Sequence, residues 1–322
     1  MGNSKNSFTE GIAAAVDDCL ARNVGVGQRV VVGLSGGVDS VVLLHALIGQ
    51  AGRYQLRLGA VHVHHAISDN ADTWESHCRD LCQAAEIPLA IARVEVERGS
   101  ADGLEAAARR ARHAAFAGIE ADWIALAHHR DDQAETMLFN LLRGTGLAGA
   151  AGMAETNGRL LRPLLSVGRQ DIAQYARSHS LVWVEDETNA DTTFSRNHLR
   201  HSVIAGLEER FPGCAANLAA ASKRFAEART LLDELALADL GGDGGFPVDV
   251  ATLDALSEPR ARNALRYLLQ RRHIGIPSEE RLREILRQLL HARTDRHPSA
   301  LFGNWRIHRH AGKVWVEFQD DA

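Results

Sequence analysis

Residues 30–40 read Val-Val-Val-Gly-Leu-Ser-Gly-Gly-Val-Asp-Ser, and the apolar run Val-Val-Leu-Leu follows at 41–44. This pattern predicts a buried strand at 30–34 that turns through glycines directly into a helix at about 40–47. Glycines let the backbone approach a ligand closely, and the amides at a helix N-terminus attract anions. We therefore expect a phosphate-binding loop made of Ser35, Gly36, Gly37, Val38, Asp39 and Ser40.

The side chains of this loop suit a nucleotide with a metal ion. The hydroxyls of Ser35 and Ser40 can donate to phosphate oxygens, whereas Asp39 cannot bind an anion directly and is predicted to hold Mg²⁺ against the phosphates. The loop contains neither the GK[ST] of a Walker A motif nor GxGxxG. The plain alternative is a tight strand-to-helix turn with Asp and Ser as caps.

Strands and helices alternate on both sides of this loop along the first half of the chain. Strands are predicted at 58–64, 89–96 and 123–127, and helices at 72–86, 104–120 and 132–143. This order predicts a doubly wound parallel α/β sheet, in which ligands bind outside the carboxyl ends of the strands. A strand at 159–161, a helix at 169–178 and the segment 181–184 extend the α/β region.

The second half reads as mainly helical and ends in a hairpin. A long helix is predicted at 211–240, followed by the glycine cluster 241–245, helices at 259–271 and 278–291, and a hairpin at 305–318. We predict a catalytic domain at 1–210, a helical linker at 211–245 and a smaller basic domain at 246–322. Residues 260–313 carry thirteen Arg and Lys against four acidic residues, which favours a polyanionic partner for that domain.

Composition excludes several classes. The chain has 322 residues, 45% of them hydrophobic, and a net charge of −5, so it is not a globally basic nucleic-acid binder. No apolar run approaches the roughly 18 residues of a membrane span, and the first residues form no signal peptide. Four cysteines without a CxxC pair predict a reducing, cytoplasmic location. A homodimer is left open.

The loop matches in full the SGGxDS motif of the PP-loop ATP pyrophosphatases, and the chain resembles that family. The resemblance implies cleavage of ATP between the α and β phosphates to give an adenylate and pyrophosphate. Within the family, residues 62–68 (HVHHAIS) look like the HVNHxLR motif of the lysidine synthetases, with departures at His64 and Ser68. No carboxylate or thiolate lies at ligand spacing in this stretch, which favours histidines lining a cleft over a metal centre.

Three further segments carry the resemblance to the lysidine synthetases. Residues 105–113 match EAxARxxRY except for His113, which implies ATP or RNA contacts by Arg109 and Arg112. Residues 128–136 (HHRDDQAET) match HHxxDxxET, and Arg143 begins the RGxG that follows. The block 186–191 with 196–200 resembles D-x-[ST]-N-x-D…R-N-x-[IL]-R, and it makes Arg196 and Arg200 candidates for phosphate contacts, ordered by Asp186 and Asp191.

Asp132 and Glu135 lie three residues apart at a predicted helix start, so they share a face near the crevice. They could be favourable caps for the helix dipole. The functional interpretation is metal binding by Asp132 together with Asp39, and charge recognition or base chemistry by Glu135.

The resemblance implies a two-step modification of tRNA. The C2 oxygen of the wobble cytidine (position 34) in a tRNA(Ile) with a CAU anticodon attacks ATP, and free lysine then displaces AMP to form lysidine. Arg109, Arg112, Arg143, Arg196 and Arg200 would contact the substrate in the anticodon region, and Asp39, Asp132 and Glu135 would be catalytic. Two alternatives are a tRNA 2-thiocytidine synthetase, which would want a CxxC or iron–sulfur cysteines that this chain lacks, and a non-catalytic ATP-binding sensor.

Overall fold

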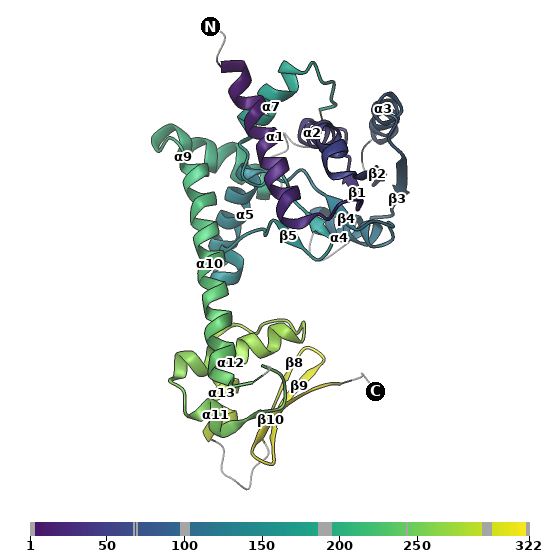
Figure 1. The fold of residues 1–322 in the computed structure, drawn as a ribbon. Helices are drawn as coiled ribbons and strands as arrows, with labels where there is room; N and C mark the ends of the chain where they lie inside the picture. Colours follow the sequence, from purple (N-terminus) through teal and green to yellow (C-terminus); the bar gives the residue numbers. More distant parts are fainter. Residues whose placement is uncertain are drawn as a thin grey trace. The chain divides into compact units, whose positions relative to one another are not determined.

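The computed structural model describes residues 4–66, 68, 70–96, 104–185, 195–242, 244–291 and 298–319. The chain divides into two compact units, Met1–Ala226 and Glu227–Ala322 (Figure 1). The division falls within the long helix α10 (Cys214–Leu240), which belongs to the segment predicted as the connection. Within the described part of the chain, none of the helices is long and apolar enough to cross a membrane.

The first unit is built on a six-stranded sheet in the order β3-β2-β1-β4-β6-β5. All neighbouring strands pair in parallel except the edge strand β5, which is antiparallel to β6. The strands are β1 (Arg29–Gly33), β2 (Arg57–His64), β3 (Leu89–Arg93), β4 (Trp123–Ala125), β5 (Thr156–Asn157) and β6 (Leu160–Leu161). The predicted doubly wound parallel sheet is confirmed.

The helices of this unit cover both faces of the sheet. They are α1 (Ser4–Asn23), α2 (Val38–Tyr54), α3 (Ala71–Ala84), α4 (Leu104–Ala117), α5 (Arg130–Leu142), α6 (Leu147–Ala150), α7 (Arg169–Ser178), α8 (Ser195–His198), the π-helix η2 (Leu199–Ile204) and α9 (Ala205–Arg210). Alternation along β1 separates the two faces: Val30 and Val32 enter the core formed with α1, α2 and α7, and Val31 enters a smaller core with Phe116 of α4. Figure 1 shows α1, α2 and α7 grouped together.

Some boundaries differ from the predictions. Helix α2 begins at Val38, earlier than predicted, and β3 ends at Arg93, because side-chain patterns locate element ends less well than elements. Helix α1 was not predicted, although Ile12, Val16 and Leu20 recur at helical spacing and are fully buried. The segment 181–184 contains no strand.

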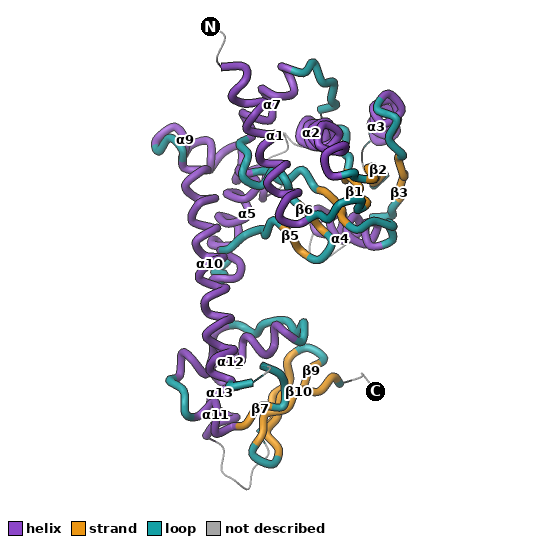
Figure 2. The backbone as a smooth tube through the Cα atoms, viewed as in Figure 1, coloured by secondary structure: helices purple, strands orange, loops and turns teal. Residues whose placement is uncertain are grey.

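The second unit packs three helices against a four-stranded antiparallel sheet in the order β7-β10-β9-β8 (Figure 2). Its elements are β7 (Val248–Asp249), α11 (Val250–Asp254), α12 (Glu258–Arg271), α13 (Glu279–His291), β8 (Ser299–Phe302), β9 (Trp305–His310) and β10 (Lys313–Phe318). The predicted hairpin is β9–β10, and its two-residue turn has positive φ at both Ala311 and Gly312, as a right-twisted hairpin favours. The short strands β7 and β8 were not predicted.

Candidate functional site

The loop between β1 and α2 has the backbone geometry that a phosphate site requires. Gly36 has a φ of +90°, and a Cβ atom there would lie 3.0 Å from Val184 Cγ2 and 3.3 Å from Cys78 Sγ. Gly37 is the N-cap of α2 in extended conformation and contributes no side chain to the amides of the first turn. Conformation and space therefore both demand glycine at position 36, whereas position 37 demands it for neither reason.

The two serines of the loop have different surroundings. Ser40 is buried; its hydroxyl donates to the Gly37 carbonyl at 2.9 Å and lies 3.1 Å from the Ser35 hydroxyl. Ser35 is exposed, and its Oγ accepts from the Gly37 amide at 3.3 Å. Ser40 thus braces the loop from inside while Ser35 faces outward, and the predicted residues 35–40 form one structural unit.

Asp39 meets the start of α5 through a buried histidine. His129 is 2% exposed, and its Nε2 lies 3.8 Å from Asp39 Oδ2 and 3.5 Å from Asp132 Oδ2. The same histidine caps α5: its Nδ1 accepts from the Asp132 amide, and Asp132 Oδ2 accepts from the His129 amide. Asp132 therefore does cap α5, which was the alternative to a functional role. Because its Oδ2 makes the cap, its Oδ1 is left to face Arg200 in the site.

These carboxylates have the chemistry of a cation site. Burial raises the pKa of Asp39, the neighbouring imidazole of His129 opposes that effect, and the charge of Asp132 adds to it. Asp39 Oδ1 is buried and has no hydrogen-bond partner among the described residues. A buried carboxylate oxygen without a donor, close to a second carboxylate, fits a hard divalent cation such as Mg²⁺.

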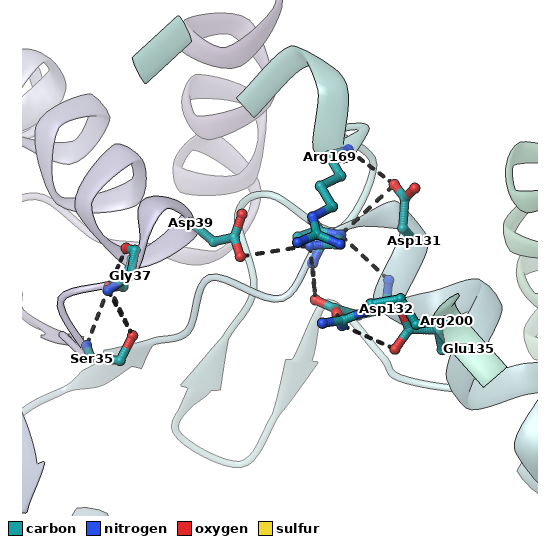
Figure 3. A network of polar contacts seen from close by, with 10 residues as sticks. Ser35, Gly37, Asp39, Asp131, Asp132, Glu135, Arg169 and Arg200 are labelled. Atoms are coloured by element: carbon teal, nitrogen blue, oxygen red, sulfur yellow. Dashed lines mark hydrogen bonds and ion pairs between the residues drawn. The ribbon is translucent and has the colours of Figure 1, made fainter. Parts of the chain in front are cut away.

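Arg200 joins the two acidic residues of α5 (Figure 3). Its Nε–H donates to Glu135 Oε1 at 2.6 Å, and its Nη2 donates to Glu135 Oε2 at 3.0 Å and to Asp132 Oδ1 at 2.9 Å. Glu135 is 4% exposed, and burial raises its pKa while Arg200 counteracts the shift. Arg200 lies on the π-helical turn η2, a rare backbone form that is frequent at functional sites.

Two of the predicted substrate-binding arginines lie over the ring of Phe139, which is one helical turn from Glu135 on α5. The Cζ atoms of Arg143 and Arg196 lie 5.2 and 5.9 Å from the ring centroid of Phe139. Phe139 and Glu135 are four residues apart on α5. Asp186 and Asp191, predicted to order the arginines, lie outside the described residues.

The predicted arginines of α4 approach a third part of the site. Burial lowers the pKa of His128 to about 3, and the positive charges of Arg162, Arg112 and Arg109 lower it further, against the opposing charge of Asp132. Arg162 is only 4% exposed, and its Nε–H donates to His128 Nδ1 at 3.2 Å. Arg109 and Arg112 also lower the pKa of His113, after burial.

Sequence reasoning gave no role to His128, His129 or Arg162, which the structure places at this site. A signal was present for the histidines, because they belong to the HHxxDxxET match. What could not be read was which acid or arginine each of them meets, since those partners come from distant parts of the chain.

The histidines of residues 62–65 have partners that linear spacing did not reveal. His62 and His64 are buried within β2; His62 Nδ1 donates to the Leu34 carbonyl at 2.9 Å. His64 Nε2 lies 3.0 Å from Asp72 Oδ1, and the fold brings ligand atoms of His64, Asp72 and Glu75 within 4.8 Å of one another. Glu75 is already bound by two arginines, through Arg79 at 2.8 Å and Arg93 at 2.7 Å, so this group is a charge network.

The positive charge of the domain predicted at 246–322 is smaller than the count for residues 260–313 indicates. Residues 246–322 contain thirteen Arg and Lys but ten Asp and Glu, a surplus of three. Many of the arginines form ion pairs within the unit or with the end of α10: Arg260–Asp239, Arg262–Glu258, Arg262–Glu279, Arg266–Glu279, Arg283–Glu258 and Arg287–Glu284. Arg293 and Arg296 lie outside the described residues.

Comparison with known proteins covers both units. Residues 9–207 match the family described as PP-loop domain, and residues 249–315 match the TilS substrate binding domain. A tRNA(Ile)-lysidine synthase from Nitrosomonas europaea is 42% identical over 313 residues, covering 93% of this chain and 68% of that protein. The one from Aromatoleum aromaticum is 44% identical, covering 94% and 72%.

Among solved structures, the U34-tRNA thiolase NcsA from Methanococcus maripaludis, described with its [4Fe-4S] cluster, is similar with a TM-score of 0.57. It is 19% identical, and the alignment covers 69% of this chain and 80% of that one. At that identity the likeness supports the shared fold of the first unit.

Proposed function

The chain belongs to the tRNA(Ile)-lysidine synthase family, and on that premise we propose that it is a carbon–nitrogen ligase that converts a cytidine of tRNA(Ile) to lysidine. ATP adenylates C2 of the wobble cytidine (position 34) in the CAU anticodon, and free lysine then replaces AMP. The observation that carries the proposal is the meeting of Asp39, Asp132 and Glu135 beside the SGGVDS loop, at the carboxyl ends of parallel strands.

The first step needs a held triphosphate and a charge-neutralising site. The cytidine O2 attacks the α-phosphorus, a new P–O bond forms, and the bond to pyrophosphate breaks. Ser35 and the amides of the loop bind phosphate oxygens, and Asp39 with Asp132 would hold Mg²⁺, which supplies neutralisation of the phosphate charge. Arg109 and Arg112 add positive charge on the side of His128.

The second step needs an amine without its proton. The amine nitrogen attacks C2, the C2–O bond breaks, and AMP leaves with that oxygen while the nitrogen gives up a proton. Glu135 is the acceptor that we propose, because burial raises its pKa toward the range of a base that can accept and later release a proton.

The surroundings of Glu135 suit free lysine as the amine. An amino acid carries both ammonium and carboxylate groups, and the cluster offers carboxylates from Asp132 and Glu135 next to the guanidinium of Arg200. Lysine that binds here would exchange these internal ion pairs for its own. This proposal moves Arg200 from the phosphate contact predicted from sequence to the amine substrate.

The two alternatives have less support. Burial raises the pKa of Cys78 to about 12 and of Cys82 to about 11, which leaves both as unreactive thiols, and a thiolating enzyme needs reactive or metal-binding cysteines. A non-catalytic ATP sensor has no need for the three clustered carboxylates. The curated relatives favour neither.

The test is release of pyrophosphate and AMP from α-labelled ATP with a tRNA(Ile) transcript bearing CAU, with and without lysine. We expect AMP and modified cytidine only when tRNA and lysine are both present, and none with Asp39→Ala. If pyrophosphate release depends on tRNA but does not change with lysine, lysine is rejected as the amine substrate and the proposed adenylation step is retained. No turnover with any RNA would favour the sensor.

A further inference from the structure

Helix α5 carries a single functional stripe. Asp132, Glu135, Phe139 and Arg143 follow one another at intervals of three, four and four residues, so they project from one face of the helix. The first two form the acidic part of the site described above. The next two continue the stripe outward by about one and two further turns, with a rise of about 1.5 Å per residue.

A second segment runs beside this stripe and repeats its spacing. Arg200 contacts Glu135, and Arg196, four residues earlier, lies over Phe139, four residues later. The π-helix η2 packs on α5, so the two pairs are successive rungs of one helix–helix contact. The inner pair is the ion pair of the reaction site. The outer contact is the Phe139 ring with the guanidinium groups of Arg143 and Arg196 over it.

The ring of Phe139 is not used to build the core. Phe139 is half-buried, and it is not a member of the hydrophobic clusters found among the described residues. By contrast, Phe116 is 4% exposed within the core under α4. Both guanidinium carbons lie over the ring, within the roughly 6 Å of its centroid at which a cation interacts with an aromatic face. A base that stacks on the ring would therefore take the place of one guanidinium group.

An aromatic ring bordered by guanidinium groups matches a nucleotide of a single strand. Bases without a pairing partner stack on aromatic rings, and arginines beside the ring take the phosphates on either side. We propose that Phe139 is the stacking platform for the nucleotide next to the reacting cytidine, with Arg143 and Arg196 on its phosphates. This inference rests on the proposed function and adds a positioning residue that sets the cytidine beside Glu135.

Stacking is tested with 2-aminopurine, whose fluorescence falls when it stacks. One tRNA(Ile) carries it in place of the adenine that follows the cytidine in CAU, and a second carries it on the preceding side. With the wild-type protein we expect fluorescence to fall on binding at one of the two positions. Phe139→Leu keeps an apolar side chain but no ring, so it should abolish that decrease, weaken tRNA binding about five- to hundredfold, and raise KM for tRNA more than it lowers kcat. Phe139→Trp should restore both signals.

The matched control is Phe211→Leu. Phe211 is 60% exposed with the Arg210 guanidinium 5.9 Å from its ring, but it lies outside the α5 stripe. Phe211→Leu should show the same decrease of 2-aminopurine fluorescence on tRNA binding as the wild-type protein. Equal losses in both variants, or no decrease at either position with the wild-type protein, would overturn the platform. Arg143→Gln should reduce the salt dependence of tRNA binding by about one ion, whereas Phe139→Leu should leave it unchanged.

Melting temperature and ATP affinity keep the result interpretable. Phe139→Leu should change neither, because Phe139 is outside the hydrophobic clusters of the described residues and makes none of the hydrogen bonds of the phosphate loop. Suppose that the wild-type protein releases pyrophosphate only with tRNA and that Phe139→Leu binds tRNA with normal affinity. The stacking role of Phe139 would then be wrong, and the proposed function would stand. Wild-type protein that shows no response to tRNA would defeat the proposed function first.

Discussion

The phosphate loop is held mainly by hydrogen bonds among its own six residues, whereas the acidic cluster beside it is held by three separate segments. Ser35, Gly37 and Ser40 bind one another through hydroxyl, amide and carbonyl groups. In the cluster, α5 supplies Asp132 and Glu135, and the other partners come from the start of α2, from the residue before α5 and from η2. The first part is a local motif and the second exists only in the folded chain.

This difference has an energetic side. The loop consists of neutral hydrogen bonds and a glycine in the left-handed region, so its cost is conformational. The cluster places three carboxylates close together, and burial raises the pKa of Asp39 and Glu135, so its cost is electrostatic. Changes in the loop should therefore act through backbone strain, and changes in the cluster through uncompensated charge.

The largest effect is expected where the two parts meet, at Asp39. Asp39→Asn keeps the shape but removes the charge that would hold a cation, and we expect a loss of about a thousandfold in the rate of tRNA-dependent pyrophosphate release. Asp131→Asn is the matched control: Asp131 accepts from the Arg169 amide at 3.0 Å, and an amide oxygen can do the same. A similar loss in both variants would mean that any carboxylate near α5 matters and that Asp39 has no special part.

Next in size is the ion pair between Arg200 and Glu135. Arg200→Met leaves two acidic groups without their counter-charge, and we expect the free energy of unfolding to fall by about 2–3 kcal/mol. Adding Glu135→Gln should return about 1–2 kcal/mol, measured by urea denaturation in a double-mutant cycle. Arg79→Met should cost under about 1 kcal/mol, because Arg79 is 57% exposed and Arg93 still binds Glu75. Additive effects of the two substitutions at the site would contradict the coupling.

The same contrast decides what could be predicted from sequence. The strand–loop–helix at 30–47 was readable because every signal, from the apolar run to the glycines and the hydroxyls, is local. The acids at 132 and 135 were readable as residues, but their partners were not. Arg200 was predicted as a candidate for phosphate contacts, and its pairing with Glu135 has no signal in the sequence. Likewise, the charge surplus of residues 260–313 omitted Asp239 and Glu258, whose partners lie inside that range.

Gly36 and Gly37 test whether changes in the phosphate loop act through backbone strain. Gly36→Ala must accept a φ of +90° and a Cβ 3.0 Å from Val184, and we expect it to lower the free energy of unfolding by about 2 kcal/mol and to weaken ATP binding. Gly37→Ala has a φ of −73° and would meet Ser35 Oγ only at 3.6 Å, so its stability should change by less than about 0.5 kcal/mol. Thermal denaturation with and without ATP measures both, and equal costs would show that the strain argument is wrong.

The smallest effect tests the charge half through pH. The folded pKa of His128, about 3, lies below its ordinary value of 6.5, so the unfolded chain binds more protons between these values. The contribution of His128 to the free energy of unfolding is therefore fully present above pH 6.5 and is lost as pH falls toward 3, by roughly 1 kcal/mol per pH unit.

His128→Asn keeps an acceptor for Arg162 but cannot be protonated, so urea denaturation between pH 7 and 5 should show a shallower decline than for the wild type. His198→Asn, at an exposed position of α8, should keep the wild-type slope. A decline that is unchanged in His128→Asn would mean that burial and the neighbouring arginines Arg162, Arg112 and Arg109 do not lower the pKa of His128.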